Sequence, residues 1–270
     1  MSLRIAFLGT GTCSASSRNP CSLAVTDGED LICVDFGGGA YHQIARLGSP
    51  FFNYKNISAI FLTHFHVDHV SGLPDFFWGE MWDSTGRRER PLTLAGPRGL
   101  KNFHEKRLLP FLGDYPVPFD VNLVELDSGE EFHGSFYRMT SCPMAHGDCS
   151  TGFLLSAEGH KLGITGDTGY CENLALLLKN SDTAVMEWSI TDSSQFPGHI
   201  SGEDMVALLD MGVMPRRVYI THVYPRPGLT FEEVLDRCRE AVAPYATEFI
   251  FARDGDTVEL VKPQGTIKDI

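Results

Sequence analysis

The sequence predicts an α/β protein whose β sheets lie between helices. Short apolar runs typical of strands alternate along the chain with longer runs typical of helices. Two of the helix-like runs begin with a capping box, and no low-complexity or Pro/Gly-rich linker divides the chain. Because each sheet or helix buries one apolar side against a neighbouring layer, we expect a single domain over residues 1–270.

The strand predictions rest on short runs that are rich in β-branched and aromatic residues. The tetrapeptides DGED at 27–30 and AEGH at 157–160 separate such runs and are typical of hairpin turns. Strands are predicted at residues 4–8, 22–26, 31–35, 59–63, 92–95, 121–125, 135–140, 152–156, 161–165, 183–187, 217–221, 248–251 and 257–261.

Four helices are predicted, at residues 98–109, 171–178, 201–211 and 230–242. In the last two, Ser201 precedes Asp204 by three residues and Thr230 precedes Glu233 by three residues. A hydroxyl at the N-cap with an acidic residue three positions later satisfies two backbone N–H groups at the start of a helix. These two helix starts are therefore the best defined.

Composition limits the cellular setting. The chain has 270 residues, 43% of them hydrophobic, but no apolar run near the roughly 20 residues that span a bilayer. The apolar stretch at the N-terminus is too short for a signal peptide. Seven cysteines without a CxxC pair do not form the pattern of a disulfide framework. We therefore expect a cytoplasmic protein with no membrane partner.

The net charge of -13 counts against long nucleic acids as partners. Proteins that grip a phosphate backbone usually present a basic face, because neutralising phosphates releases counterions. Here the basic residues gather only in the short segments 87–90 and 216–217. A small substrate is the expected partner.

Metal-binding side chains follow three of the predicted strands. His64 follows the strand at 59–63, Asp167 follows the strand at 161–165, and His222 follows the strand at 217–221. His146 comes a short loop after the strand at 135–140. In α/β folds ligands bind outside the carboxyl ends of strands, so these residues are expected to share one site.

The segment THFHVDH at 63–69 favours two ions over one. In an extended segment His64 and His66 point to the same side and can bind one ion. A turn after Val67 then directs Asp68 and His69 elsewhere, toward a second ion. Nitrogen and oxygen ligands suit zinc or manganese. A solvated polar loop, or a thiolate site formed by Cys142, His146 and Cys149, are the alternatives at this point.

The intact HxHxDH motif and the later TGD and TH strand ends resemble the metallo-β-lactamase superfamily along nearly the whole chain. That resemblance implies a four-layer αββα sandwich. It also implies two divalent ions, zinc first with manganese or iron as alternatives. By the resemblance, the first ion is held by His64, His66 and His146, the second by Asp68, His69 and His222, and Asp167 bridges them.

The segments LGTGT, VDFGGG around Asp35, AGPRG, GDTG and GHISGED resemble the branch that contains ribonuclease Z and related phosphodiesterases. This resemblance implies that His199 assists phosphate cleavage with Glu187 as its acidic partner, and that Asp68 also orients the nucleophile. A surface histidine and a solvated carboxylate are the alternatives for His199 and Glu187. The long basic arm that grips transfer RNA in ribonuclease Z is absent between His146 and Asp167, where the sequence has room for one hairpin.

The resulting prediction is a dinuclear metal-dependent hydrolase that uses a hydroxide bridging the two ions. Small phosphodiesters, of the cyclic nucleotide or cyclic phosphate type, are the expected substrates. The alternatives are transfer-RNA 3′ processing as in ribonuclease Z, hydrolysis of lactones, thioesters or aryl sulfates, and metal binding without catalysis. Related enzymes are often dimers, so a homodimer stays open.

Overall fold

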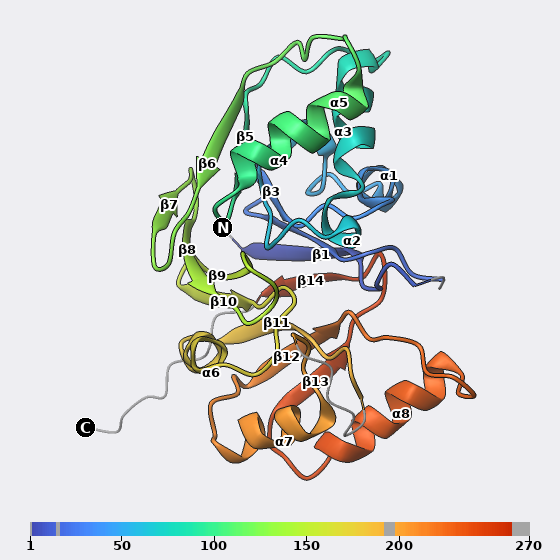
Figure 1. Ribbon diagram of the computed structural model, residues 1–270, viewed down its shortest axis with the longest axis vertical. Helices are drawn as coiled ribbons and strands as arrows, with labels where there is room; N and C mark the ends of the chain where they lie inside the picture. Colours follow the sequence, from blue (N-terminus) through green and yellow to red (C-terminus); the bar gives the residue numbers. More distant parts are fainter. Residues whose placement is uncertain (1, 15–16, 192–197, 261–270) are drawn as a thin grey trace.

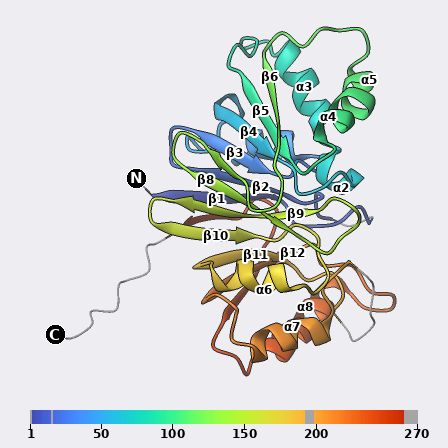
Figure 2. The same cartoon turned by 60° about the vertical axis from the view of Figure 1, so that its left-hand side comes forward.

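The structure is a computed structural model that describes residues 2–14, 17–191 and 198–260. Within these residues, two seven-stranded sheets pack face to face and helices cover the outer face of each sheet (Figures 1 and 2). The order helix, sheet, sheet, helix is the αββα sandwich that the family resemblance implied. The fold-class prediction is therefore confirmed.

The first sheet is antiparallel at one side and parallel at the other. Strands β14, β1, β2 and β3 pair antiparallel, whereas β3, β4, β5 and β6 pair parallel. In sheet order the strands are β14 (Thr257–Leu260), β1 (Leu3–Gly9), β2 (Ser22–Thr26), β3 (Leu31–Val34), β4 (Ile57–Phe61), β5 (Leu92–Gly96) and β6 (Val121–Glu125).

The second sheet repeats this mixed arrangement. Its parallel strands are β13, β12, β11 and β10, and the remaining pairs are antiparallel. In sheet order the strands are β13 (Glu248–Phe251), β12 (Arg217–Thr221), β11 (Thr183–Glu187), β10 (His160–Ile164), β9 (Thr151–Ala157), β8 (Arg138–Pro143) and β7 (Glu131–His133).

Each sheet has its own layer of helices. The first sheet is covered by α1 (Ala40–Leu47), the short 3-10 helix η1 (Tyr54–Asn56), α2 (Val67–Val70), α3 (Leu73–Trp82), α4 (Leu100–Phe103), the π-helical turn η2 (His104–Leu108) and α5 (Leu109–Leu112). The second is covered by α6 (Glu172–Lys179), α7 (Gly202–Asp210) and α8 (Phe231–Val242). The two capping boxes are present at Ser201 and Thr230, as predicted.

Three apolar clusters hold the four layers together. One lies between the first sheet and its helices, one lies between the two sheets, and one lies between the second sheet and its helices. Successive strand residues alternate between clusters: Val185 faces the other sheet, whereas Ala184 and Met186 face the helices. Strands buried on both faces are continuously apolar, which explains why these runs were easy to predict.

Most predicted strands agree with the structure within one or two residues, but one strand prediction and one helix prediction need correction. The strand predicted at 135–140 begins only at Arg138, because a turn closed by the Gly134 N–H and the Tyr137 carbonyl (2.9 Å) precedes it. The helix predicted at 98–109 continues to Leu112 and contains a π-helical turn. Helices α1 and α3 and strand β7 were not predicted. Val261, the last residue of the predicted strand 257–261, lies outside the described residues.

The segment between His146 and Asp167 is short and regular. It contains β9 and β10, which pair antiparallel through a tight turn at Glu158 and Gly159. No arm projects from this part of the fold. Across the described residues, none of the helices has both the length and the apolar character needed to cross a bilayer.

Candidate metal centre

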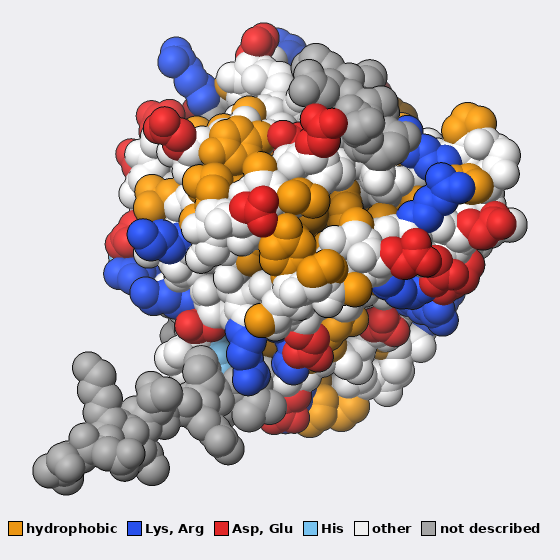
Figure 3. Space-filling view, turned by 90° about the horizontal axis from the view of Figure 1, so that it is seen from below, with side chains coloured by type: hydrophobic (Ala, Val, Ile, Leu, Met, Phe, Trp, Pro, Cys, Tyr) orange, Lys and Arg blue, Asp and Glu red, His pale blue; other side chains and the backbone are white. Residues whose placement is uncertain are grey.

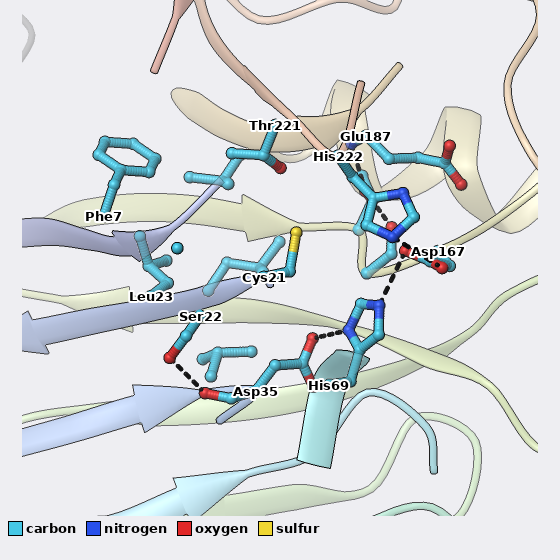
Figure 4. A pocket seen from close by; sticks show the side chains of 16 residues that line it. Phe7, Cys21, Ser22, Leu23, Asp35, His69, Asp167, Glu187, Thr221 and His222 are labelled. Carbon is cyan, nitrogen blue, oxygen red and sulfur yellow. Dashed lines mark hydrogen bonds and ion pairs between the residues drawn. The ribbon is translucent and has the colours of Figure 1, made fainter. Parts of the chain in front are cut away.

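The carboxyl ends of the parallel strands place the predicted ligands at one edge of the sandwich. From the first sheet, β4 leads into His64, His66, Asp68 and His69; from the second, β10 leads into Asp167 and β12 leads into His222. Figure 4 shows His69, Asp167 and His222 directed toward one another between the two sheets. Both sheets therefore contribute to the site.

The side chains form three groups with metal-binding geometry, and two of these groups contain the seven predicted ligands. In each group, one donor atom per residue lies within 4.8 Å of the donor atoms of the others. The first group is His64, His66, His146 and Asp167; the second is Asp68, His69 and His222. The structure thus brings together all seven residues that the sequence singled out, in the predicted division. That they bind metal stays a prediction.

Asp167 lies between the two groups. Its Oδ1 is 3.3 Å from Nε2 of His69, and its Oδ2 is 3.4 Å from Nε2 of His222. The same Oδ2 is 3.8 Å from Nε2 of both His64 and His146. One carboxylate thus faces histidines of both groups, as a bridging ligand must.

The local backbone explains the division of the HxHxDH segment. The chain is still extended at His66 (φ -69°, ψ 153°), and α2 begins at Val67. His64 and His66 therefore share one side of an extended segment, while Asp68 and His69 project from the first turn of a helix. The turn predicted after Val67 is this short helix.

Asp35, which the sequence analysis did not assign to the site, orients two ligands. Its Oδ2 accepts a hydrogen bond from Nδ1 of His69 (2.7 Å), and its carboxylate also accepts from the backbone N–H and hydroxyl of Thr63. The Thr63 oxygen in turn lies 3.0 Å from Nδ1 of His64. Asp35 has φ 56°, a conformation that costs energy for a non-glycine residue and is common at functional sites.

His146 and His222 are oriented in the same way. Nδ1 of His146 donates to the carbonyl of Gly198 (2.7 Å). Nδ1 of His222 lies 2.8 Å from Oγ of Ser189, whose hydroxyl donates to the carbonyl of His222. His222 also has a left-handed backbone, with φ 56°. A histidine that donates through Nδ1 keeps the lone pair of Nε2 for a metal, and such partners usually accompany metal ligands.

Divalent cations fit the arrangement of these side chains. Nε2 of His64 and Nε2 of His69 are buried, and neither has a hydrogen-bond partner in the described structure. Nε2 of His222 faces the Asp68 carboxylate at 3.3 Å, so two electron-rich atoms converge. Buried donor atoms in this arrangement need a cation or a proton among them. The mixed imidazole and carboxylate set is the kind that holds zinc or manganese.

The electrostatics of the site agree with this fit. Burial lowers the pKa of His64 to about 2, so this imidazole stays neutral and able to coordinate. Burial alone would raise the pKa of Asp68, but the neighbouring imidazoles of His222 and His69 hold that pKa below its usual value. Burial alone would lower the pKa of His69, but Asp167 and Asp35 on its two sides raise it. Positive charge is therefore favoured between these carboxylates.

The hydrogen-bonded pair formed by His199 and Glu187 lies beside the two groups of predicted ligands. Nδ1 of His199 is 3.0 Å from Oε1 of Glu187, and both side chains are buried. A donor atom of His199 lies within 4.8 Å of donor atoms of Asp167 and His222. Glu187 is fixed by the backbone N–H groups of Thr168 (2.6 Å) and Ser189 (3.2 Å). Neither the surface-histidine nor the solvated-carboxylate alternative fits this burial.

Several other candidates lie elsewhere. In the described part of the chain, no group of metal-binding side chains includes a cysteine, so Cys142 and Cys149 do not form a thiolate site with His146. The other four histidines do not join a group either; they are His42, His104, His133 and His160. Cys13 and Tyr224 also contact the site and were not predicted from the sequence. The Cys13 N–H donates to Oδ2 of Asp68 (3.2 Å), and the Tyr224 ring packs edge-on against His199 and His222.

Sequence comparisons identify the relatives of this chain. A family model described as "Beta-lactamase superfamily domain" matches residues 33–223, more than half of the chain. Ribonuclease Z of Staphylococcus carnosus is 26% identical, covering 96% of this chain and 100% of that protein. The alignment runs over 319 positions, so the relative contains residues with no counterpart here. Ribonuclease Z of Methanosarcina mazei is 34% identical, but over 57% of this chain and only 48%, about half, of its own length.

Solved structures share the fold at low identity. The metallo-β-lactamase fold protein YhfI from Bacillus subtilis superimposes with a TM-score of 0.77 at 15% identity, covering 96% of this chain and 100% of that one. The short form of human tRNase Z gives 0.71 at 20% identity, covering 94% and 98%. A diphosphatase from the PhnP family gives 0.70 at 19% identity, covering 96% and 98%. At these identities the likeness establishes the fold alone.

The family match spans the strand ends that carry all seven predicted ligands, from before the HxHxDH segment to His222. The fold, the set of donor side chains and the relatives all indicate the same family. The chain therefore belongs to the metallo-β-lactamase superfamily, as a hydrolase with ribonuclease Z-like relatives.

Proposed function

We propose that this protein is a phosphodiesterase that cleaves small phosphodiesters at a centre of two divalent cations. The observation that carries the proposal is the buried pair of His199 and Glu187 beside the two ligand groups. Beside an activated water, a buried acid–base pair can protonate the leaving group. Phosphodiester cleavage needs one, because the leaving alkoxide must be protonated.

Two cations would be held by the residues already described. His64, His66 and His146 would hold one, Asp68, His69 and His222 the other, and Asp167 would contact both. When bound, two divalent ions supply a water of lowered pKa and positive charge that stabilises the phosphoryl oxygens. Zinc is the first expectation, with manganese or iron as alternatives, because the donor set does not distinguish them.

His199 would donate the proton to the leaving oxygen. Burial alone would lower the pKa of His199, but the hydrogen bond with Glu187 and the charge of that carboxylate raise it. The same hydrogen bond through Nδ1 fixes the orientation of the ring beside the two ligand groups. Glu187 is a positioning residue, because in the described residues its carboxylate binds His199 and the backbone N–H groups of Thr168 and Ser189.

Asp68 would orient the attacking water as well as bind metal. One carboxylate oxygen, Oδ2, already accepts hydrogen bonds from the Cys13 N–H and faces Nε2 of His222. This contact fixes the plane of the carboxylate. A fixed acceptor next to the nucleophile lowers the entropic cost of reaching the transition state.

The shape and charge of the chain favour a small substrate. The segment between His146 and Asp167 forms only the β9–β10 hairpin, so there is no arm at this position to grip transfer RNA. The net charge is -13, and the face seen in Figure 3 mixes acidic and basic side chains with apolar ones. Cyclic nucleotides and ribose cyclic phosphates fit better than long RNA, whose binding relies on basic surfaces.

Transfer-RNA 3′ processing is the second candidate. It is favoured by the 26% identity that extends over nearly the whole chain to a protein named ribonuclease Z. A precursor transfer RNA belongs in the same assay panel as the small esters. Cleavage of the RNA at a rate well above that of small phosphodiesters would favour this second candidate.

The proposal is tested by turnover of bis-p-nitrophenyl phosphate beside a lactone, a thioester and an aryl sulfate. We expect the phosphodiester to be the best substrate. For a cyclic nucleotide, whose leaving group is an alkoxide, His199→Ala should reduce kcat by about 100-fold or more, the size of a general acid contribution, while the bound metal stays the same. His133→Ala, which removes an exposed histidine elsewhere, is the matched control. Unchanged kcat in the His199 variant would refute its role, and a carbonyl ester as the best substrate would refute the function.

A further inference from the structure

An apolar pocket opens next to the metal centre and shares one of its residues. Its volume is about 510 Å³. His66, a member of the first ligand group, forms part of its wall. The side chains that give the pocket its character are Phe65, Phe103, Arg107, Leu108 and Phe111. A molecule in this pocket would therefore lie directly beside whatever occupies the metal centre.

The motif itself turns one aromatic ring into this pocket. Phe65 stands between His64 and His66 in an extended segment, so its side chain points away from the two histidines. The Phe65 ring stacks on the ring of Phe103, with centroids 5.0 Å apart and planes 13° apart. The HxHxDH segment thus supplies metal ligands and, through Phe65, part of an aromatic wall.

The rest of the wall comes from an irregular helix. Phe103 ends α4, Arg107 and Leu108 lie in the π-helical turn η2, and Phe111 lies in α5. Single π-helical turns inside α-helices are rare and occur frequently at functional sites. The widened turn is thus an independent sign that this wall has a function.

The pocket leaves apolar surface in contact with solvent. Phe111 is 78% exposed and Val67 is 64% exposed, the two highest values among the large apolar side chains of the described residues. Arg107, also exposed, places a positive charge at the same wall, and the lining includes one exposed carboxylate, that of Asp75. An exposed aromatic ring with a cation in the same wall suits a flat ring attached to an anion.

We infer that this pocket binds the nucleobase of a nucleotide phosphodiester whose phosphate lies at the metal centre. The inference rests on the proposed phosphodiesterase function and adds the class of its substrate. The base would stack against the exposed Phe111 and the Phe65–Phe103 pair, with Arg107 near the anionic or carbonyl groups of the nucleotide. Stacking of this kind tolerates any base, so the pocket would select nucleotides over simple alkyl esters rather than one base over another.

The test compares two esters with the same leaving group, thymidine 5′-(p-nitrophenyl phosphate) and methyl p-nitrophenyl phosphate, on the metal-loaded protein. We expect wild type to prefer the nucleotide ester in kcat/KM by about tenfold or more, the size of one base–aromatic stack. Phe111→Ala should reduce that ratio by about tenfold. Phe51→Ala removes another exposed phenylalanine outside the pocket and serves as the matched control, with an unchanged ratio.

Calorimetric binding of thymidine 5′-monophosphate gives a readout without turnover, and Phe111→Ala should weaken it by a similar factor. If both esters turn over but neither their ratio nor nucleotide binding responds to Phe111→Ala, the pocket inference is overturned and the proposed function stands. If neither ester turns over but nucleotide binding depends on Phe111, the proposed function fails and the pocket is supported. If Phe111→Ala dissociates a dimer in sedimentation and reduces both kcat/KM values in parallel, the surface belongs to a second copy of the chain and the inference is overturned.

Discussion

The two halves of the metal centre differ in their contact with solvent. In the first group His66 is exposed and His146 is partly exposed, whereas Asp68, His69 and His222 of the second group are all buried. The second group is also held by side chains from both sheets, Asp35 for His69 and Ser189 for His222. The first group borders the apolar pocket through His66.

This difference separates two tasks that one site must perform. The second group is part of the packed interior, so its geometry is fixed before any metal arrives. The first group faces the space where a substrate must enter. Removing a ligand of the second group should consequently reduce both folding stability and metal occupancy. Removing the exposed ligand of the first group should reduce metal occupancy alone.

The largest contrast is expected between His69→Ala and His66→Ala. Each should leave the protein with one ion fewer than wild type. In the metal-free protein, His69→Ala also leaves the carboxylates of Asp35 and Asp167 buried without the imidazole between them, which should reduce the free energy of unfolding by about 3 kcal/mol. His66→Ala removes an exposed side chain and should change this free energy by less than about 0.5 kcal/mol.

Urea unfolding of the two metal-free variants, compared with metal-free wild type, measures this contrast. Equal losses of stability in both variants would contradict the distinction between the buried second ligand group and the partly exposed first group.

A smaller effect is expected from Asp35→Asn. Asparagine keeps the size of the side chain and tolerates the left-handed backbone at this position. It loses the charge that orients His69 and, through Thr63, His64. Metal affinity should fall by about 10- to 100-fold, the usual cost of removing such a partner. Competition with a chromophoric chelator measures it, and an affinity equal to that of wild type would show that Asp35 does not orient the ligands.

The sequence allowed the ligand set to be predicted because each ligand follows an apolar strand. His64, Asp167 and His222 all stand just beyond such a run, and parallel strands bring their carboxyl ends together. Asp35 follows β3 in the same way, so its position after an apolar strand could have assigned it to the site, but it was not assigned there. Gly198 could not be predicted as the partner of His146, because it contributes a backbone carbonyl, which every residue type has.

The missed helices have a similar physical explanation. Helix α3, with the sequence LPDFFWGEMW, has apolar residues on most of its circumference and so lacks the one-sided pattern that predicts a helix. Its buried Glu80 faces Arg88, which lies eight residues on and beyond the end of the helix, so no helical pattern indicates this pair. The π-helical turn in residues 104–108 likewise depends on packing rather than on sequence period. By contrast, helices α7 and α8 carry their own start signals in the capping boxes and were predicted closely.

The central claim is that the seven side chains hold two ions, one in each group. Native mass spectrometry of the purified protein, loaded with zinc and freed of excess metal, measures this number directly. Two zinc ions per chain are predicted for wild type, and also for His199→Ala, since His199 is assigned to the substrate. A maximum of one ion per chain in wild type would contradict the two-metal centre and the division of its ligands.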